Sequence, residues 1–393
     1  MEQWISCLNQ VLRRESQGGR DMERRQRRGF AVAVLLTGLL ASEAWGKTTL
    51  FVANNGVDGA SCGTSNSPCR SLSKAIQNAS AGDKISVGPG RYGDLNRDGA
   101  FSPAAGEEAA EDSGGCACMI KIDKAVTIES KSGAGATILD AGGGSERIVR
   151  IQASGVTFGN TKKGFTLVGG ADFGVVLDDG TADVSVGGNL VTDTNLEAFS
   201  ISGSEHSVAG NIANANGGEG FVVDGPGHSL KGNLASGNED NGFRLAFTSS
   251  DASLVGNAST GNGDAGFRVT GTDHSLTGNV ASGNQEQGFR VFETGHVLKD
   301  NAAVGNRRSG IVFENAATGS AKRSNLYGND VDFENCGLLN QSNSTVDATS
   351  SFWGAAGGPG DEPADAACSE PGSTTFWDPP SNKEISVKPK LPF

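Results

Sequence analysis

The sequence predicts an all-β fold: a single-stranded, right-handed parallel β-helix, or solenoid, with a short N-terminal cap helix. The main evidence is a repeat of 22 residues, lengthened once to 24 by a two-residue insertion. One column of this repeat holds large apolar residues: Phe199, Phe221, Phe243, Phe267, Phe289, Ile311 and Phe333. Two further columns hold asparagine: Asn189, Asn211, Asn233, Asn257, Asn279 and Asn301 in one, and Asn216, Asn238, Asn262, Asn284 and Asn306 in the other. All three columns absorb the insertion together, which indicates one structural unit repeated along the chain.

Each repeat unit has the pattern of short strands joined by tight turns. Phe243 and Leu245 flank the polar Arg244, and such alternation of apolar and polar residues is typical of a β-strand. The chain contains 59 glycines, and glycine and asparagine between the alternating runs favour tight turns. In stacked coils, equivalent residues lie about 4.8 Å apart. We therefore expect an internal phenylalanine stack, a second apolar column (Leu230, Leu254, Leu276 and Leu298) and hydrogen-bonded ladders of asparagine amides.

The N-terminal region has the pattern of a secretory signal. Basic residues follow Met22, an apolar run extends from Phe30 to Leu40, and small residues follow it. The run is shorter than the roughly 20 residues that cross a bilayer, so no transmembrane span is expected. The chain is thus predicted to be exported, to an extracellular, periplasmic or cell-surface location.

The chain divides into five expected segments. These are an over-extended start with the signal peptide (1–46), an N-terminal cap and first coil (47–93), an acidic inserted loop (94–118), the β-helix coils (119–350), and a closing segment and tail (351–393). Leu72, Ala75 and Ile76 lie on one face of a segment led by Ser71, which predicts the cap helix.

Six cysteines remain once the leader, with Cys7, is removed. An even number in an exported protein predicts disulfides. Cys62 and Cys69 are close enough in sequence to pair. Cys116 and Cys118 form either a tight ring or bonds elsewhere, and Cys336 and Cys368 lie near the C-terminus. Six cysteines allow 15 connectivities, so the pairing stays open.

Three segments carry a resemblance to a known superfamily. Residues 81–92 (AGDKISVGPGRY) resemble the first coil of secreted pectin-lyase-like β-helix proteins, and residues 68–76 resemble their cap helix. Residues 352–360 (FWGAAGGPG) are similar to the closing segment of such repeat proteins. The resemblance implies a bacterial β-helix fold. It does not specify an activity, because the superfamily includes polysaccharide lyases, hydrolases, epimerases, adhesins and inert surface proteins.

The inserted loop contains a candidate calcium site. Asp94, Asn96 and Asp98 match the opening D-x-N-x-D-G of an EF-hand-type loop, in which alternate oxygens bind one cation. Position twelve is Ala105 where that pattern has glutamate, although Glu107 and Glu108 follow. The alternative is an acidic surface loop with a glycine turn.

Catalytic candidates come from the least regular coil of the repeat: Asp193, Glu197, Glu205 and His206. All four histidines of the chain, His206, His228, His274 and His296, share one repeat slot, with Ala252 in that slot between them. No acidic or cysteine ligand completes a metal set around them, so a stacked turn position is favoured over a metal site. No active-site motif of a pectate lyase, polygalacturonase or alginate epimerase is present.

Arg244, Arg268 and Arg290 are candidate substrate-binding residues. They share the outward position between two inward-facing residues and so form a cationic row. Arginine binds carboxylates or sulfates in a bidentate manner, as recognition of an acidic glycan requires. Asp240, Asp264 and Glu286, three residues before each phenylalanine, are nearby carboxylates, and the alternative is a solvated ion-pair network.

Two hypotheses for function follow. The formal net charge of −13 argues against a nucleic-acid partner, because phosphate neutralisation needs a basic surface. In the first hypothesis the chain binds or processes an acidic polysaccharide or cell-surface glycan and, if an enzyme, is a polysaccharide lyase or glycoside hydrolase. In the second it is a non-catalytic envelope, surface or adhesion protein. Calcium is the one cofactor expected, and the oligomeric state stays open. An active cleft requires broken periodicity, so 94–115 and 158–205 are the regions where a site is expected.

Overall fold

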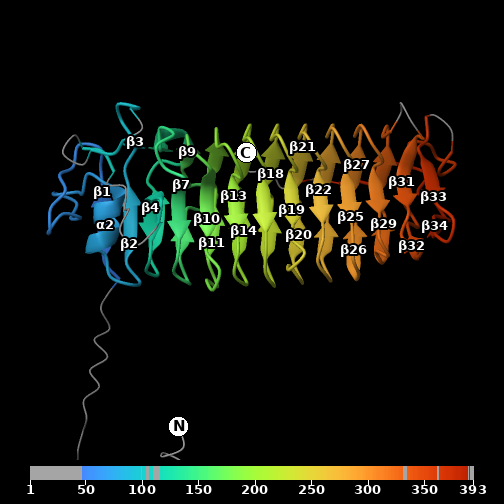
Figure 1. Ribbon diagram of the computed structural model, residues 1–393, viewed down its shortest axis with the longest axis horizontal. Coiled ribbons are helices and arrows are strands. Elements are labelled where there is room, and N and C mark those ends of the chain that lie inside the picture. Colours follow the sequence, from blue (N-terminus) through green and yellow to red (C-terminus); the bar gives the residue numbers. More distant parts are fainter. Residues whose placement is uncertain are drawn as a thin grey trace, which may run out of the picture. The chain divides into compact units, whose positions relative to one another are not determined.

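The chain forms a parallel β-helix in which three sheets run along one long axis (Figure 1). The computed structural model describes residues 47–98, 100–102, 106–108, 116–330, 334–360, 363–387 and 389. The predicted leader, 1–46, lies outside the described residues. In all but the first and last coils, the chain passes through sheet 1, sheet 2 and sheet 3 in turn. The three sheets have 13, 10 and 11 strands. The predicted fold is confirmed.

Every strand pairs in parallel with strands of the preceding and following coils. Sheet 1 consists of β1 (Thr49–Val52), β2 (Lys84–Val87), β5 (Thr127–Ser130), β8 (Thr157–Phe158), β11 (Ser185–Gly187), β14 (Ser207–Ala209), β17 (Ser229–Lys231), β20 (Ser253–Val255), β23 (Ser275–Thr277), β26 (His296–Lys299), β29 (Gly319–Lys322), β32 (Thr345–Asp347) and β34 (Thr374–Phe376). Sheet 2 consists of β3 (Gly90–Gly93), β6 (Thr137–Asp140), β9 (Thr166–Val168), β12 (Leu190–Thr192), β15 (Ile212–Asn214), β18 (Leu234–Ser236), β21 (Ala258–Thr260), β24 (Val280–Ser282), β27 (Ala302–Val304) and β30 (Asn325–Tyr327). Sheet 3 consists of β4 (Cys118–Ile122), β7 (Arg147–Ile151), β10 (Phe173–Leu177), β13 (Phe199–Ile201), β16 (Phe221–Val223), β19 (Phe243–Leu245), β22 (Phe267–Val269), β25 (Phe289–Val291), β28 (Ile311–Phe313), β31 (Cys336–Asn340) and β33 (Ala366–Ser369).

The interior is built from the predicted columns. Phe199, Phe221, Phe243, Phe267 and Phe289 stack face to face, with 4.7 Å between successive ring centroids. The column continues through Ile311 to Leu338, which takes the place expected for Phe333. Phe333 itself lies outside the described residues. The correction arises because the coil after Ile311 is longer than the repeat, so counting 22 residues stops short of the next strand.

Both asparagine columns form the expected amide ladders. At the corner between sheets 1 and 2, each side-chain Nδ2 from Asn189 to Asn279 donates to Oδ1 of the next coil at 3.0–3.1 Å. At the corner between sheets 2 and 3, the ladder from Asn216 to Asn306 continues to Asn329 and ends on the buried carboxylate of Asp365. These amides satisfy buried backbone groups at corners where no strand can do so.

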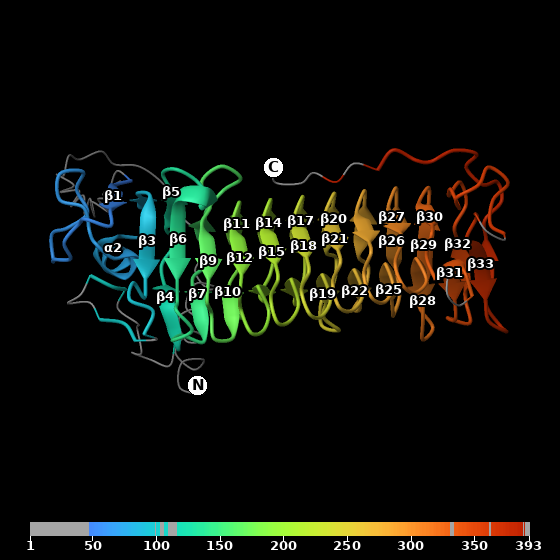
Figure 2. The same ribbon diagram turned by 90° about the horizontal axis from the view of Figure 1, so that it is seen from above.

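A helix closes the N-terminal end of the β-helix (Figures 1 and 2). Helix α2 (Leu72–Asn78) is capped by Ser71, whose hydroxyl accepts from the Lys74 amide, and it buries Leu72, Ala75 and Ile76. A short 3₁₀ turn, η2 (Ala134–Ala136), leads directly into β6. In the part of the chain that the structure describes, no helix is long and apolar enough to span a bilayer.

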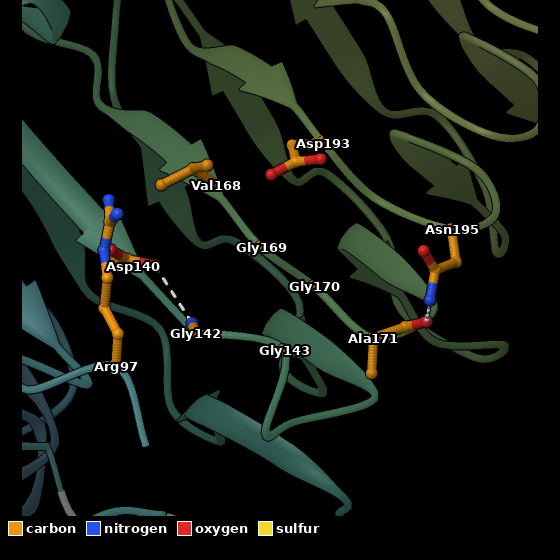
Figure 3. Close-up of a pocket in the computed structure, with 10 residues that line it drawn as sticks. All are labelled: Arg97, Asp140, Gly142, Gly143, Val168, Gly169, Gly170, Ala171, Asp193 and Asn195. Atoms are coloured by element: carbon orange, nitrogen blue, oxygen red, sulfur yellow. Dashed lines mark hydrogen bonds and ion pairs between the residues drawn. The ribbon is translucent and has the colours of Figure 1, made fainter. Parts of the chain in front are cut away.

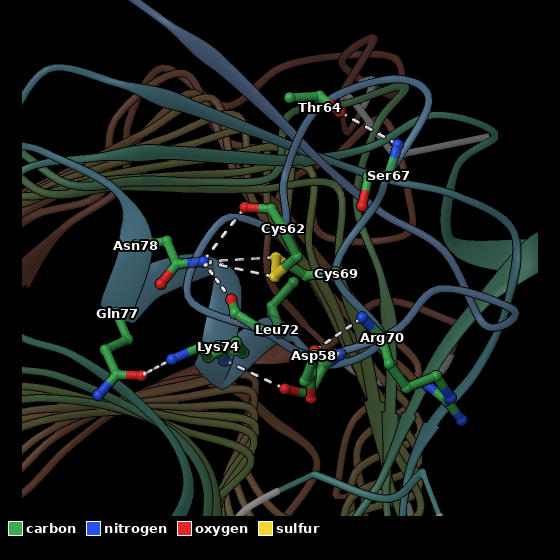
Figure 4. Close-up of a disulfide and its surroundings, with 12 residues drawn as sticks. Asp58, Cys62, Thr64, Ser67, Cys69, Arg70, Leu72, Lys74, Gln77 and Asn78 are labelled. Atoms are coloured by element: carbon green, nitrogen blue, oxygen red, sulfur yellow. Dashed lines mark hydrogen bonds between the residues drawn. A yellow bond between two sulfur atoms is a disulfide. The ribbon is translucent and has the colours of Figure 1, made fainter.

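Three disulfides form, each between cysteines of one neighbourhood: Cys62–Cys69, Cys116–Cys118 and Cys336–Cys368. The first holds the loop before α2, where the Asn78 side chain donates to the Cys62 carbonyl at 3.1 Å (Figure 4). The third joins β31 to β33 near the C-terminal end.

Candidate functional site

A groove lies on the β-helix surface at the corner between sheets 2 and 3. It has a volume of about 320 Å³. Its lining residues are Arg97, Asp140, Gly142, Gly143, Val168, Gly169, Gly170, Ala171, Asp193 and Asn195 (Figure 3). The inserted loop supplies Arg97, and the coil singled out for its irregularity supplies Asp193. The two regions where a site was expected thus meet in one groove.

The lengths of the corner turns explain why the surface is hollowed here. The turn after β9 has four residues, 169–172, whereas the turns on either side of it have six, 141–146 and 193–198. The short turn therefore sits below its neighbours. Beside it, position 142 requires glycine for two reasons. A Cβ at Gly142 would overlap the carboxylate of the buried Asp94, and the backbone of Gly142 has a φ of 59°.

One wall of the groove carries a buried carboxylate held by two arginines. Asp140 is 2% exposed and pairs with Arg91, while Arg97 Nε lies 3.4 Å from Asp140 Oδ2. The Gly142 amide donates to Asp140 Oδ1 at 3.0 Å. Burial and the neighbouring Arg97 charge lower the pKa of Arg91. The Arg97 side chain is 66% exposed, so its guanidinium also faces solvent over the groove.

The opposite wall carries an exposed carboxylate. Asp193 follows β12 with a φ of 59°, a conformation that aspartate tolerates better than most residues. Its side chain points across the groove toward Val168 (Figure 3). Among the described residues, no donor or cation is bonded to the Asp193 carboxylate. The amide of Asn195 donates to the Ala171 carbonyl at 2.6 Å and leaves its oxygen toward the groove.

The other three catalytic candidates lie outside the groove. Glu197 is half-buried on the same turn, and its burial, reinforced by the Glu219 carboxylate, raises its pKa. Glu205 is an exposed turn residue at the corner between sheets 3 and 1. His206 is fully buried there and both of its ring nitrogens are engaged. The structure therefore does not bring the four candidates together, and Asp193 alone lines the groove.

Arg97 and Asp140 were not singled out as site residues by sequence reasoning. Asp140 ends an ordinary strand, and Arg97 stands inside the calcium-like motif. Their proximity depends on turn lengths in segments more than 40 residues apart, for which the repeat contains no signal.

The side chains of the calcium-like motif form hydrogen bonds with other groups of the same motif. The Asp94 carboxylate accepts from the Arg97 amide at 2.6 Å, and the Asn96 and Asp98 side chains bond each other at 2.9 Å. Glu107 and Glu108 are both 1% exposed. The Glu107 carboxylate accepts from the amides of Leu95, Asn96 and Ser102, and the Glu108 carboxylate accepts from the first amides of α2. Neither glutamate therefore has its carboxylate available as the bidentate ligand that the motif lacks.

Converging metal-ligand groups occur at two other places in the described residues. One contains Asp58 with Cys62 and Cys69, and the other contains Glu334 with Cys336 and Cys368. Both cysteine pairs are disulfides, so their sulfurs are not available as thiolate ligands.

Comparison with known proteins supports the fold. Residues 151–303 match a family model described as a right-handed β-helix region. The A-module of the mannuronan C-5 epimerase AlgE4 of Azotobacter vinelandii is similar, with a TM-score of 0.57 and 15% identity over 79% of this chain and 93% of that one. The chain has the fold of a right-handed parallel β-helix.

Two further solved structures are similar to this β-helix. The AlgE6 A-module of the same organism has a TM-score of 0.55 and 16% identity over 78% of this chain and 93% of that one. A rhamnogalacturonan lyase has a TM-score of 0.50 and 14% identity over 84% and 87%. These neighbours are polysaccharide-processing proteins by name, and at such identities the likeness shows the fold alone. No curated protein matches the sequence.

The arginine row of the β-helix is present, but its members differ. Arg244, Arg268 and Arg290 are in register on the outer face of sheet 3. Arg244 pairs with Glu219 at 2.7 Å and Arg290 with Glu314 at 2.8 Å, so the bonded carboxylates are not Asp240, Asp264 or Glu286. Arg268 forms no ion pair with any described residue.

Arg268 instead lies over an aromatic ring. Its guanidinium carbon is 5.0 Å from the ring centre of Phe292, and that of Arg290 is 5.1 Å from the same centre. Such stacking holds a guanidinium in place and leaves its N–H groups free. Within the row, Arg268 alone thus combines a held position with an unneutralised charge.

Proposed function

We propose that this β-helix binds an acidic polysaccharide, with one sugar residue held in the groove between Arg97 and Asp193. The observation that carries the proposal is the pairing of an exposed guanidinium with an unpartnered carboxylate across the groove. A guanidinium binds a sugar carboxylate through charge-assisted hydrogen bonds. Asp193 and the Asn195 oxygen accept hydrogen bonds from sugar hydroxyls. The similar solved structures include two mannuronan C-5 epimerases and a rhamnogalacturonan lyase, and these neighbours support this substrate class.

The charges of the groove favour proton abstraction over glycosidic acid–base chemistry. A glycosidase needs two carboxyl groups that act on one bond. Asp140 is buried and already paired with Arg91, which leaves Asp193 as the free carboxylate among the described residues that line the groove. A base beside a cation that neutralises the sugar carboxylate is the arrangement that removes a proton next to that carboxylate. If the chain is an enzyme, we therefore propose lyase-type chemistry. Asp193 takes the proton from the carbon next to the sugar carboxylate, a C=C bond forms as the glycosidic C–O bond on the adjacent carbon breaks, and the leaving oxygen takes a proton from water.

The outer face of sheet 3 supplies a second contact in this proposal. Arg268 is the member of the row that we assign to glycan binding, because the charges of Arg244 and Arg290 are taken up by Glu219 and Glu314. Calcium at Asp94, Asn96 and Asp98 stays a prediction and no step of this proposal depends on it.

The test is binding of the full chain to alginate, polygalacturonate and a neutral glucan, measured by calorimetry. We expect Arg97→Gln and Asp193→Asn each to weaken binding of an acidic polymer about tenfold or more, as loss of a charged hydrogen bond predicts. Exposed residues of the same types, Arg307→Gln and Asp179→Asn, are the controls and should bind as the parent does. Arg268→Gln should weaken binding while Arg244→Gln should not. Equal affinity of the groove variants and the parent, or no binding to any acidic polymer, would overturn the proposal.

A structural role is the second candidate, and one observation favours it. From β14 to β28 the coils repeat with little variation, which suits a rod better than an active surface. Unsaturated sugar ends released by the parent chain, and lost in Asp193→Asn, would decide for an enzyme. Binding without release would indicate a binding or adhesion protein.

A further inference from the structure

Four buried histidines lie in one column at the corner between sheets 3 and 1. His206, His228, His274 and His296 are at most 1% exposed, and no proposed function uses them. Ala252 occupies the same slot between His228 and His274, so the column consists of two adjacent pairs. Ring centroids within the pairs are 5.1 and 5.2 Å apart.

Hydrogen bonds determine which nitrogen of each ring carries the proton. Every Nε2 faces a backbone carbonyl at 2.6–2.9 Å, and a carbonyl can only accept: Ser202, Asp224, Thr270 and Phe292. Every Nδ1 accepts from a backbone amide of the preceding coil at 3.1–3.3 Å: Val184, His206, Ala252 and His274. All four imidazoles are therefore neutral and protonated on Nε2.

Protonation of Nδ1 is incompatible with this arrangement. The added N–H would point at the amide N–H that Nδ1 now accepts, and it would place a buried charge about 5 Å from a second imidazole. Burial lowers the pKa of every one of these histidines, and His296 reinforces the effect at His274, whose pKa falls to about 4.

The groups that face the column oppose this effect only in part. Carboxylates of four turn residues, Asp183, Asp224, Asp251 and Asp273, act to raise the pKa of the histidines beside them. The Thr181 and Ser249 hydroxyls contact the Nε2 of His206 and His274 at 3.3 and 3.2 Å. The net direction is downward at all four rings.

We propose that the histidine column is an acid-sensitive set of hydrogen bonds that joins neighbouring coils at this corner of the β-helix. At neutral pH the neutral rings tie each coil to the one before it. In acid, proton uptake breaks these ties and frees four backbone amides, so the corner opens. The folded-state pKa values lie below the unfolded value of about 6.5. The stability that these hydrogen bonds contribute is therefore fully present above that pH and is lost as pH falls toward the folded values.

The proposal is tested directly on the full chain labelled with ¹⁵N-histidine. The chain has four histidines, so two-bond ¹H–¹⁵N spectra contain signals from this column alone. We expect all four rings as the Nε2–H tautomer at pH 7.5, and still neutral at pH 6. Signals of the Nδ1–H tautomer, or rings half protonated near pH 6.5, would overturn the proposal.

The consequence for stability is tested by urea unfolding between pH 6.5 and 5. The unfolding constant should rise up to about 10⁴-fold per pH unit, because the unfolded chain takes up as many as four more protons. The double variant His274→Ala/His296→Ala repeats the alanine that the chain already carries at Ala252. Because two of the four histidines are removed, the unfolding constant of this variant should rise at most about 10²-fold per pH unit. An unchanged pH dependence in that variant would contradict the proposal, and a failure of the variant to fold leaves the tautomer spectra of the parent as the deciding measurement.

Discussion

Buried polar side chains are repeated in this protein as regularly as its apolar ones. At each corner, the backbone turns away from the strand ladders and leaves amides that must find acceptors inside the protein. Asparagine at two corners and histidine at the third supply these acceptors from the next coil. A side chain that both donates and accepts can satisfy its own coil and its neighbour at once.

Removal of one ladder amide should be costly. Asn257 Oδ1 accepts from both the backbone amide and the side chain of Asn233. We expect Asn257→Ala to lower the free energy of unfolding by about 1–3 kcal/mol, because two buried donors lose their acceptor. Denaturant unfolding measures this change, with the exposed Asn214→Ala as the control. An unchanged midpoint for Asn257→Ala would contradict an energetic role for the ladder.

Glycine precedes four of the column phenylalanines, Phe221, Phe243, Phe267 and Phe289, and close approach of the next coil explains it. A Cβ at Gly266 would lie 2.7 Å from the Gly288 carbonyl oxygen and 2.9 Å from the Cβ of Ala281. Gly242 and Gly288 are similarly crowded. The Gly-Phe pair therefore combines the largest core side chain with the one residue that lets the neighbouring coil approach this closely.

At the scale of elements, the inserted loop is tied to the cap helix. Glu108, a residue of the loop, caps α2. Its carboxylate accepts from the Leu72 amide at 2.6 Å and from the amide and hydroxyl of Ser73. Arg70 lies over the ring of Tyr92, on β3, at 5.5 Å. The loop that carries Arg97 is thus held at Glu108 by the same helix that closes the β-helix.

Calcium binding by this loop should be weak. Asp94, Asn96 and Asp98 supply oxygens, but the carboxylates of Glu107 and Glu108 are already taken up by backbone amides, so we expect a Kd on the order of 10⁻⁴–10⁻³ M. Calorimetry with calcium chloride measures it. Asp98→Asn should abolish the heat, whereas Asp123→Asn, an exposed acidic residue outside the loop, should not. Equal heats for the parent and Asp98→Asn would rule out this site.

At the scale of the whole β-helix, stability is propagated from coil to coil and the ends need special support. In such quasi-one-dimensional proteins each coil contacts only its neighbours, so unfolding starts at the ends. Asp365 terminates one amide ladder, and Cys336–Cys368 joins the last strands of sheet 3 across 32 residues. Both features occur at the C-terminal end, where α2 has no counterpart among the described residues.

Loss of this disulfide should loosen the C-terminal end first. We expect Cys336→Ser/Cys368→Ser to lower the free energy of unfolding by about 3–4 kcal/mol, from the entropy of closing a 32-residue loop. Hydrogen exchange should rise in β31 to β34 before it rises elsewhere. Cys62→Ser/Cys69→Ser, which opens a loop of 7 residues, should cost less and affect the N-terminal end. Exchange that rises uniformly would contradict end-first unfolding.

Much of the fold could be predicted from the residue pattern, and less of the site. The phenylalanine stack, both amide ladders and the cap helix follow from spacing, because stacked coils place equivalent residues side by side. The placement of Phe333 was wrong where a coil departs from 22 residues. Asp193 was a catalytic candidate because its coil is irregular, and it stays a candidate; Arg97 and Asp140, across the groove from it, were not predicted as site residues.

The amino-acid sequence by itself determined how the coils stack along the axis of the β-helix. A repeat of constant length places equivalent residues of successive coils next to each other. The tertiary structure decided what happens around that axis. The groove lies where a short turn stands between two longer turns. Ion pairs with glutamates of neighbouring coils neutralise Arg244 and Arg290, whereas Arg268 lies over the ring of Phe292. The physical reason is that a periodic pattern specifies which residues are equivalent, whereas charge pairing and surface shape depend on how particular side chains and turns meet in space.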